Sequence, residues 1–320
     1  MAKRKSSSRG GSRRGFRLQL AFWFNLALLA LLAGWFALQP PVRRAEVGKL
    51  VENYFEKNKR IELFDIARDI YQLYYSAEFV RAEPPAGDRT HLYGGVPRHV
   101  TFPHPVRVLA NRGYLVGYCE ALESPVWAAY RVADISRLLP PAPRPERFET
   151  DVRTAARVSP EDYTGSGYDR GHLAPNYAIA TRYGEEAQRE TFLMSNIIPQ
   201  RHTLNAGPWK DLEMKTATSY PGRFGEVWVI VGPVFGAHPE TLRNGTAIPD
   251  AGFMILIDES DGRVRLQALL LPQDTPAGAD LDGFLTTVDE IERRTGLDFL
   301  SELEDSAENQ LEANRAGRVW

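Results

Sequence analysis

Residues 166–176 read SGYDRGHLAPN, and residues 193–213 read LMSNIIPQRHTLNAGPWKDLE. The first segment places His172 in a polar loop between charged and small residues. The second places Asn205 and Glu213 eight residues apart, which is about two turns along a helix. Taken alone, a histidine after glycine is usually structural, and an asparagine just ahead of a Gly-Pro pair suits a helix N-cap. The order of the two segments along the chain is more informative than either segment alone.

Together the two segments resemble the DNA/RNA non-specific endonucleases, a family of ββα-metal enzymes with a DRGH signature. The signature stands at 169–172, and the second segment follows the family's order of SN-x-x-PQ, LN, W and LE. The similarity extends over roughly 108–303. It implies an α+β, ββα-metal nuclease fold with a largely antiparallel central sheet. It also implies metal-dependent hydrolysis of DNA and RNA with little sequence specificity.

The resemblance assigns a role to each reactive side chain. His172 would be the general base that takes a proton from the attacking water, since an imidazole with a pKa near 6.5 has a neutral fraction at pH 7. Asn205 would offer a neutral oxygen to one Mg²⁺, with Mn²⁺ able to substitute. Arg170 would clamp phosphate as a bidentate donor. Glu213 would hold metal-bound waters or orient the site.

Other positions of the motif receive supporting roles. Asn196 is expected at the site because the family has an asparagine there, and Asp169 is expected to fix the loop geometry. The family also places an arginine upstream, and both Arg144 and Arg147 qualify. Gly207 and its neighbours depart from the helix-friendly stretch usual in the family, which puts the position of Asn205 in question. We expect the remaining histidines that we considered, His91, His104, His202 and His238, to be structural because they have no ligand-like spacing.

The body of the chain alternates strand and helix patterns without a βαβ rhythm. Apolar, β-branched runs bounded by Gly, Asp and Pro predict strands, and the pattern over 280–294, with a glycine after it, predicts a helix. Such grouping favours an α+β domain over 106–303, followed by a polar tail over 304–320 that we expect to fray. The predicted strands are 106–110, 114–120, 126–132, 226–235, 253–258 and 264–271.

The N-terminal region predicts a membrane anchor. Residues 1–17 carry seven basic side chains and no acid, and 18–38 form an uncharged apolar run that would span roughly 31 Å as a helix. This asymmetry predicts a cytoplasmic N-terminus, an uncleaved signal-anchor and a body beyond the membrane, in a bacterial periplasm or outside the cell. Export by the twin-arginine route, or a mitochondrial presequence leading to the intermembrane space, stays open. Residues 39–105 are expected to form a helical stalk and a Pro/Gly linker.

Composition restricts the alternatives. The chain has 320 residues and a net charge of −2, so the residues after the basic tail carry −9. Cys119 is the only cysteine, which excludes an intramolecular disulfide and cysteine-rich zinc sites. An acidic body needs a local basic cleft to bind nucleic acid.

Two other functions stay open from the sequence. A membrane-tethered nucleic-acid-binding protein could keep the nuclease fold without catalysis, and an enzyme of this kind could hydrolyse a different phosphodiester. DNA and RNA are the expected substrates and the membrane is an expected partner. A homodimer is plausible by resemblance, whereas an inhibitor protein cannot be read from the residues.

Overall fold

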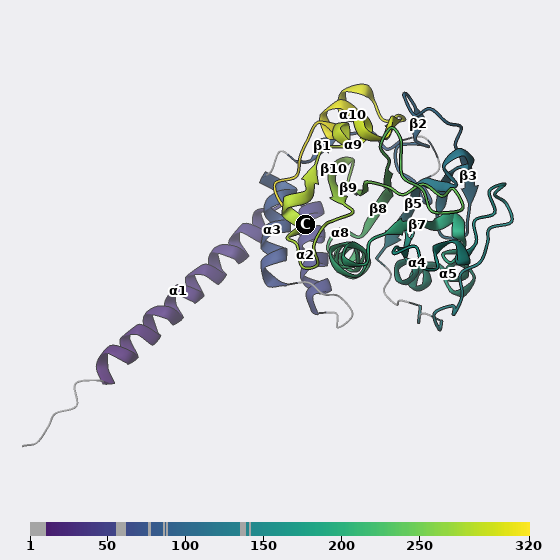
Figure 1. The fold of residues 1–320 in the computed structure, drawn as a ribbon. Helices are drawn as coiled ribbons and strands as arrows, with labels where there is room; N and C mark the ends of the chain where they lie inside the picture. The colour runs from purple at the N-terminus through teal and green to yellow at the C-terminus, as the bar shows by residue number, and fades with distance from the viewer. Residues whose placement is uncertain are drawn as a thin grey trace, which may run out of the picture. The chain divides into compact units, whose positions relative to one another are not determined.

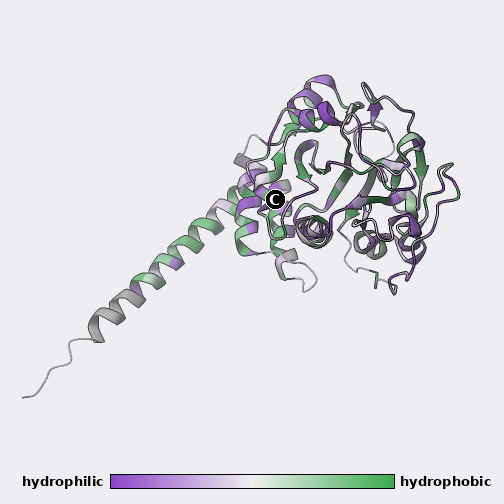
Figure 2. Cartoon of the chain, viewed as in Figure 1, coloured by the Kyte–Doolittle hydropathy of each residue, from purple (hydrophilic) through white to green (hydrophobic). Residues whose placement is uncertain are grey.

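The computed structural model describes residues 11–55, 62–75, 78–85, 87, 89–134, 139–140 and 142–320. The chain divides into two units, Met1–Glu52 and Asn53–Trp320. The first contains helix α1 (Gly11–Leu38) and most of α2 (Pro41–Phe55). Within α1, Gln19–Leu38 is long and apolar enough to cross a membrane, as its green colour in Figure 2 illustrates. By length and composition this segment suits an anchor or a signal sequence equally.

The second unit is built on one antiparallel sheet (Figure 1). All six predicted strands are present, within two residues of their expected bounds. The mixture of helices with an antiparallel sheet is the architecture that the sequence predicted. The strand order along the sheet is β1 (Val80–Arg81), β10 (Arg263–Pro272), β9 (Ala251–Ser260), β8 (Glu226–Val234), β5 (Ser124–Ala133), β4 (Leu115–Cys119) and β3 (Arg107–Ala110), with β11 (Leu285–Thr286) also paired to β10.

Both faces of this sheet are covered. In β8, Val229 and Val231 face one core cluster, whereas Trp228 and Ile230 face the other. This alternation explains why the central strands are apolar throughout instead of at every second residue. Helices α4 (Asn176–Tyr183), α5 (Glu185–Glu190), α7 (Lys210–Thr218) and α8 (Tyr220–Phe224) contribute to the first cluster, and α9 (Val288–Thr295) and α10 (Asp305–Glu312) contribute to the second.

Two short strands and a helix form a separate motif on the first face. Strand β6 (Asp169–His172) pairs antiparallel with β7 (Ile197–Gln200). The chain continues through α6 (His202–Leu204) and an irregular turn into α7. The ββα motif carries the DRGH segment and the Asn205–Glu213 segment side by side in one layer.

A further two-stranded pair, apart from this motif, joins β2 (Arg98–His99) to β12 (Leu297–Asp298).

The helix expected over 280–294 is shorter than predicted. A 3₁₀ turn covers Leu281–Phe284, and β11 then pairs with β10 before α9 begins at Val288. Thr287 caps α9, because its side chain accepts a hydrogen bond from the backbone N–H of Glu290. The apolar spacing over 280–294 is helical, but Leu285 and Thr286 pair with β10 at the edge of the sheet instead of continuing a helix.

Part of the expected stalk belongs to the domain. Helix α3 (Leu63–Tyr75) places Asp69 against Arg223, and both side chains are almost completely buried. On the same helix, Gln72 accepts a hydrogen bond from Arg265, whose guanidinium also donates to Asp258. These contacts fix α3 to the sheet, so this segment is not a free spacer.

The expectation that the C-terminal tail frays is wrong. Trp320 is only 2% exposed, and its backbone N–H donates to the Gln267 side chain. Its ring lies 5.4 Å from that of Phe224 and 4.5 Å from the guanidinium of Arg265. The aromatic terminal residue therefore anchors a segment whose composition is otherwise polar.

We expect Trp320→Ala to lower the free energy of unfolding of the full chain by roughly 3–5 kcal/mol, as for other buried aromatic truncations. Urea denaturation followed by circular dichroism measures this loss. The control is Val152→Ala, at a position 72% exposed, which should change stability little. Equal stability of the two variants would show that the tail does not pack.

Candidate active site

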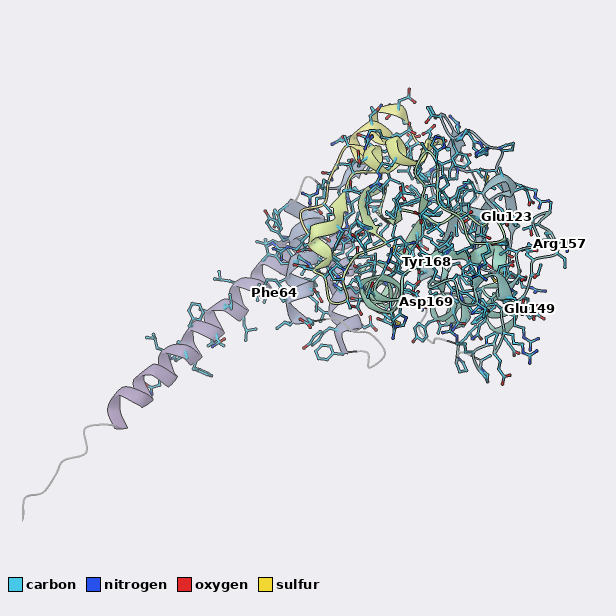
Figure 3. The ribbon with its side chains drawn as sticks, viewed as in Figure 1. Phe64, Glu123, Glu149, Arg157, Tyr168 and Asp169 are labelled. Atoms are coloured by element: carbon cyan, nitrogen blue, oxygen red, sulfur yellow. The ribbon has the colours of Figure 1, made fainter. Side chains whose placement is uncertain are left out.

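Strand β6 holds the DRGH segment in register against β7. Asp169 lies opposite Gln200 and His172 opposite Ile197. A Cβ at Gly171 would overlap the Gln200 side chain, so a larger residue here would force that side chain to move. Because side chains alternate along a strand, successive residues of the motif point to opposite faces of the β6–β7 pair. Figure 3 labels Asp169 and Tyr168 at the start of this strand.

His172 lies in an aromatic enclosure. The centroid of its ring is 5.4 Å from that of Phe148 and 5.1 Å from that of Phe192. Burial, with a smaller contribution from the charge of Arg144, lowers the pKa of His172 to about 3. Its Nε2 atom is buried and has no hydrogen-bond partner among the described residues. The lowered pKa keeps the imidazole neutral at pH 7.

Arg170 is held in place by the backbone and by aromatic rings. Its guanidinium donates to the carbonyl oxygen of Pro160 through two nitrogens. It also lies 5.7 Å from the ring centroid of Phe148 and 5.9 Å from that of Tyr163. These contacts give the cation a defined position at the edge of the His172 enclosure.

Asp169 connects β6 to the helical segment. Its Oδ2 accepts a hydrogen bond from Asn205 Nδ2 at 3.0 Å and lies 2.8 Å from Nδ1 of His202. Because the amide nitrogen of Asn205 is used in this way, its carbonyl oxygen is the atom left to bind a ligand. The His202 contact was not expected from the sequence, since nothing in its spacing signalled a partner so far along the chain.

The helix between Asn205 and Glu213 is irregular, as the Gly-Pro pair predicted. Residues Asn205–Trp209 form a π turn, and Gly207 has the non-helical angles φ −106° and ψ −118°. The kink does not separate Asn205 from Glu213, because both line one cavity. Burial raises the pKa of Glu213 to about 8, against the opposing effect of the Arg144 and Lys210 charges.

A cavity of about 320 Å³ brings these groups together. The sequence motifs identified most of its polar lining, but they did not identify Lys210, Asn176 or Tyr177. The Lys210 side chain adds a third cation, and its place between Asn205 and Glu213 on the same segment was the available signal. The chemically active residues that line the cavity are Arg144, Arg170, His172, Asn176, Tyr177, Asn205, Lys210 and Glu213.

The structure also distinguishes the two upstream arginines. Arg144 lines the cavity, and its guanidinium lies 5.2 Å from the ring centroid of Phe192. Arg147 is not among the residues that line this cavity. The charge of Arg144 contributes to the lowered pKa of His172, so its influence reaches the expected base.

Asn196 binds backbone groups on both sides and does not line the cavity. It is completely buried, and its Oδ1 accepts a hydrogen bond from the backbone N–H of Ala174. Its Nδ2 donates to the carbonyl oxygens of Ala174 and Thr191. With its amide engaged by backbone on both sides, Asn196 cannot touch a substrate in this arrangement. Its hydrogen bonds join the segment after His172 to the segment before β7.

The donor set fits a hard divalent cation. Asn205 presents an amide oxygen and Glu213 a carboxylate, which are the ligand types that Mg²⁺ and Mn²⁺ accept. A buried carboxylate with a raised pKa is a group that a nearby cation would stabilise in its charged form. The same cavity contains three basic side chains, which suits an anionic ligand beside the metal.

Comparisons with known proteins identify the family of the chain. A family model described as DNA/RNA non-specific endonuclease matches residues 98–306. A nuclease of Nostoc sp. is 30% identical over 232 residues, 69% of this chain and 82% of that protein. The nuclease of Serratia marcescens is 34% identical over 199 residues, covering 58% of this chain and 72% of that protein.

A mitochondrial relative and a solved structure extend the comparison. Human mitochondrial endonuclease G is 33% identical over 167 residues, 48% of this chain and 55% of that protein. A crystal structure of the EndoG/EndoGI complex matches with a TM-score of 0.55 at 22% identity, covering 65% of this chain and 92% of that chain, which shows a shared fold. The chain belongs to the DNA/RNA non-specific endonuclease family.

Proposed function

We propose that this protein is a membrane-anchored, Mg²⁺-dependent endonuclease that hydrolyses phosphodiester bonds of DNA and RNA. The observation that carries the proposal is the single cavity in which a neutral histidine, an amide oxygen, a buried carboxylate and three cations converge. Phosphodiester hydrolysis needs an activated water, neutralised phosphate oxygens and a stabilised leaving oxygen. Each need has a matching group in the cavity.

His172 acts as the general base in this proposal. Its imidazole takes one proton from the water that attacks phosphorus, and the bond from phosphorus to the leaving oxygen breaks. The aromatic rings of Phe148 and Phe192 keep the imidazole in its neutral form before the reaction. Neutral imidazole is the form that can accept the proton.

The basic side chains bind the phosphate. Arg170, fixed by the carbonyl oxygen of Pro160, and Arg144 present guanidinium groups to non-bridging oxygens, and Lys210 adds a point charge. Asn205 and Glu213 would hold Mg²⁺, with Asp169 fixing the orientation of the Asn205 amide. When bound, the metal supplies positive charge to the phosphate and the leaving oxygen.

Little sequence specificity is expected. The groups of the cavity address phosphate, which is common to every nucleotide, and no group there was identified as reading a base edge. The same reasoning makes DNA and RNA equivalent at the reacting centre. The apolar segment Gln19–Leu38 and the basic tail before it support an N-terminal anchor with the catalytic unit outside the cytoplasm.

The test of the proposal is cleavage of supercoiled plasmid and of total RNA by the purified full chain with Mg²⁺. We expect His172→Ala to lower the cleavage rate about 10²–10⁴-fold, the usual contribution of a general base. His238→Ala is the matched control and should stay within a few-fold of wild type, because His238 is exposed and does not line the cavity. DNA binding without any cleavage by the folded wild type would favour the non-catalytic function instead.

Metal binding should depend on Asp169. We expect Asp169→Asn to weaken Mn²⁺ binding about 10- to 100-fold, because the residue that orients a ligand tunes its affinity. Isothermal titration of the full chain with Mn²⁺ measures the change, and Asn205→Ala should weaken binding at least as much. If Asn205→Ala bound Mn²⁺ like the wild type, Asn205 would not be a ligand. EDTA should abolish cleavage by every variant.

The two upstream arginines provide a matched pair. Arg144→Ala should lower kcat/KM about 10- to 100-fold, since a hydrogen bond to a charged group contributes roughly 1.5–3 kcal/mol. Arg147→Ala should leave kcat/KM nearly unchanged. Initial rates on a short DNA substrate give both values. Equal losses in the two variants would refute the assignment of Arg144 to the site.

A further inference from the structure

A cluster of five carboxylates lies away from the catalytic cavity, where the last two helices meet. Its members come from α9, β12 and α10. Oxygen atoms of Asp289, Glu292 and Glu312 lie within 4.8 Å of one another, and so do those of Asp298, Glu308 and Glu312. Glu312 is common to both groups of three. Helices α9 and α10 lie together in the yellow C-terminal part of Figure 1.

Glu312 is the unusual member of this cluster. It is only 6% exposed, and its Oε1 atom is buried with no hydrogen-bond partner among the described residues. Across the described part of the chain, none of the five carboxylates forms an ion pair with a lysine or arginine. A buried charge without a partner is costly, so the native state must neutralise it in another way.

Glu292 and Glu312 lie side by side at the centre of the cluster, and a hydrogen bond between their side chains requires a proton on one of the two carboxyl groups. Burial, together with the charges of neighbouring acids, raises the pKa of Glu312 to about 9. Burial also raises the pKa of Glu292 to about 7, although one of its oxygens accepts the backbone N–H of Phe299 at 2.7 Å.

We propose that Asp289, Glu292 and Glu312 bind a Ca²⁺ ion. Calcium takes carboxylate oxygens at 2.3–2.6 Å in flexible geometry. The three oxygens lie within 4.8 Å of one another, so small movements of the side chains bring all of them within reach of one ion. Asp289 is exposed, which leaves room for water to complete the coordination. Mg²⁺ fits less well, because it demands near-ideal octahedral geometry and is seldom enclosed by protein ligands alone.

The site is separate from the catalytic one. Val288 and Ile291 of α9 and Leu311 of α10 pack into the core cluster on one face of the sheet. Leu204 and Leu212, from the segment that carries Asn205 and Glu213, pack into the cluster on the other face. A Ca²⁺ ion here would hold α9 against α10 and so strengthen the attachment of the C-terminal segment, without contributing to the reaction.

The test is thermal unfolding of the full chain in detergent, with excess Mg²⁺ present throughout and with or without CaCl₂. At a Ca²⁺ concentration about 100 times its Kd, we expect the Tm to rise by roughly 5–10 °C. Glu312→Gln should fold, since an amide of the same shape removes the buried charge, and should lose this Ca²⁺-dependent rise. Glu290→Gln is the matched control, because Glu290 lies on α9 outside the cluster and pairs with Arg293. It should respond like the wild type.

Equilibrium dialysis with ⁴⁵Ca²⁺ in excess Mg²⁺ provides a direct measurement on the wild type. One Ca²⁺ per chain supports the proposal, its loss in Glu312→Gln places the ion at the cluster, and its loss in Asp289→Asn but not in Asp298→Asn assigns it to the proposed three carboxylates. No bound Ca²⁺ in the wild type overturns it and leaves protons as the neutralising species. An equal rise in Tm for wild type and Glu312→Gln also overturns it, because the ion would then bind elsewhere. Plasmid cleavage in Mg²⁺ should be the same with and without this ion, so the result is independent of the proposed nuclease activity.

Discussion

The structure depends on a central antiparallel sheet that is buried on both faces. Strands β5, β8 and β9 expose almost no side chain, so an apolar layer must cover each face. The ladder satisfies the backbone polar groups, and the two layers remove apolar side chains from water. One layer contains the ββα motif and the other contains α9 and α10. The remaining features follow from how each layer is attached.

On the face of the sheet that carries the cavity, the burial that attaches the ββα motif to the sheet also shifts the pKa values of its side chains. Leu173 and Leu212 are completely buried in the core beneath the motif, and they lie next to His172 and Glu213 in sequence. The same burial lowers the pKa of the histidine and raises that of the glutamate. The Asp169 carboxylate then joins the strand to the helical segment through Asn205. Packing therefore sets both the geometry and the protonation of the site.

On the opposite face of the sheet, part of the covering layer is a mostly polar C-terminal segment. The C-terminal segment is polar, yet it packs because Leu311 and Trp320 insert into the two core clusters. Its acidic side chains gather near α9 instead of dispersing in solvent, and one of them is buried. A proton or a bound cation would offset the repulsion between these carboxylates. The layer with the ββα motif thus places the buried carboxylate of Glu213 in the cavity, whereas the layer with α9 and α10 places that of Glu312 in the acidic cluster.

The sequence by itself determined the strands, the family and most of the polar residues that line the cavity. Local patterns are sufficient for strands with continuous apolar runs, and His172, Arg170, Asn205 and Glu213 stand in motifs with fixed order. Tertiary structure alone decided the rest. The choice of Arg144 over Arg147, the contact of His202 with Asp169, the buried clamp made by Asn196 and the docking of Trp320 all depend on segments distant in the chain. Periodicity reports which face of an element is apolar, but it cannot report which distant side chain will meet that face. The sheet edge that shortened the helix expected over 280–294 is the same effect, because a strand partner is a long-range contact.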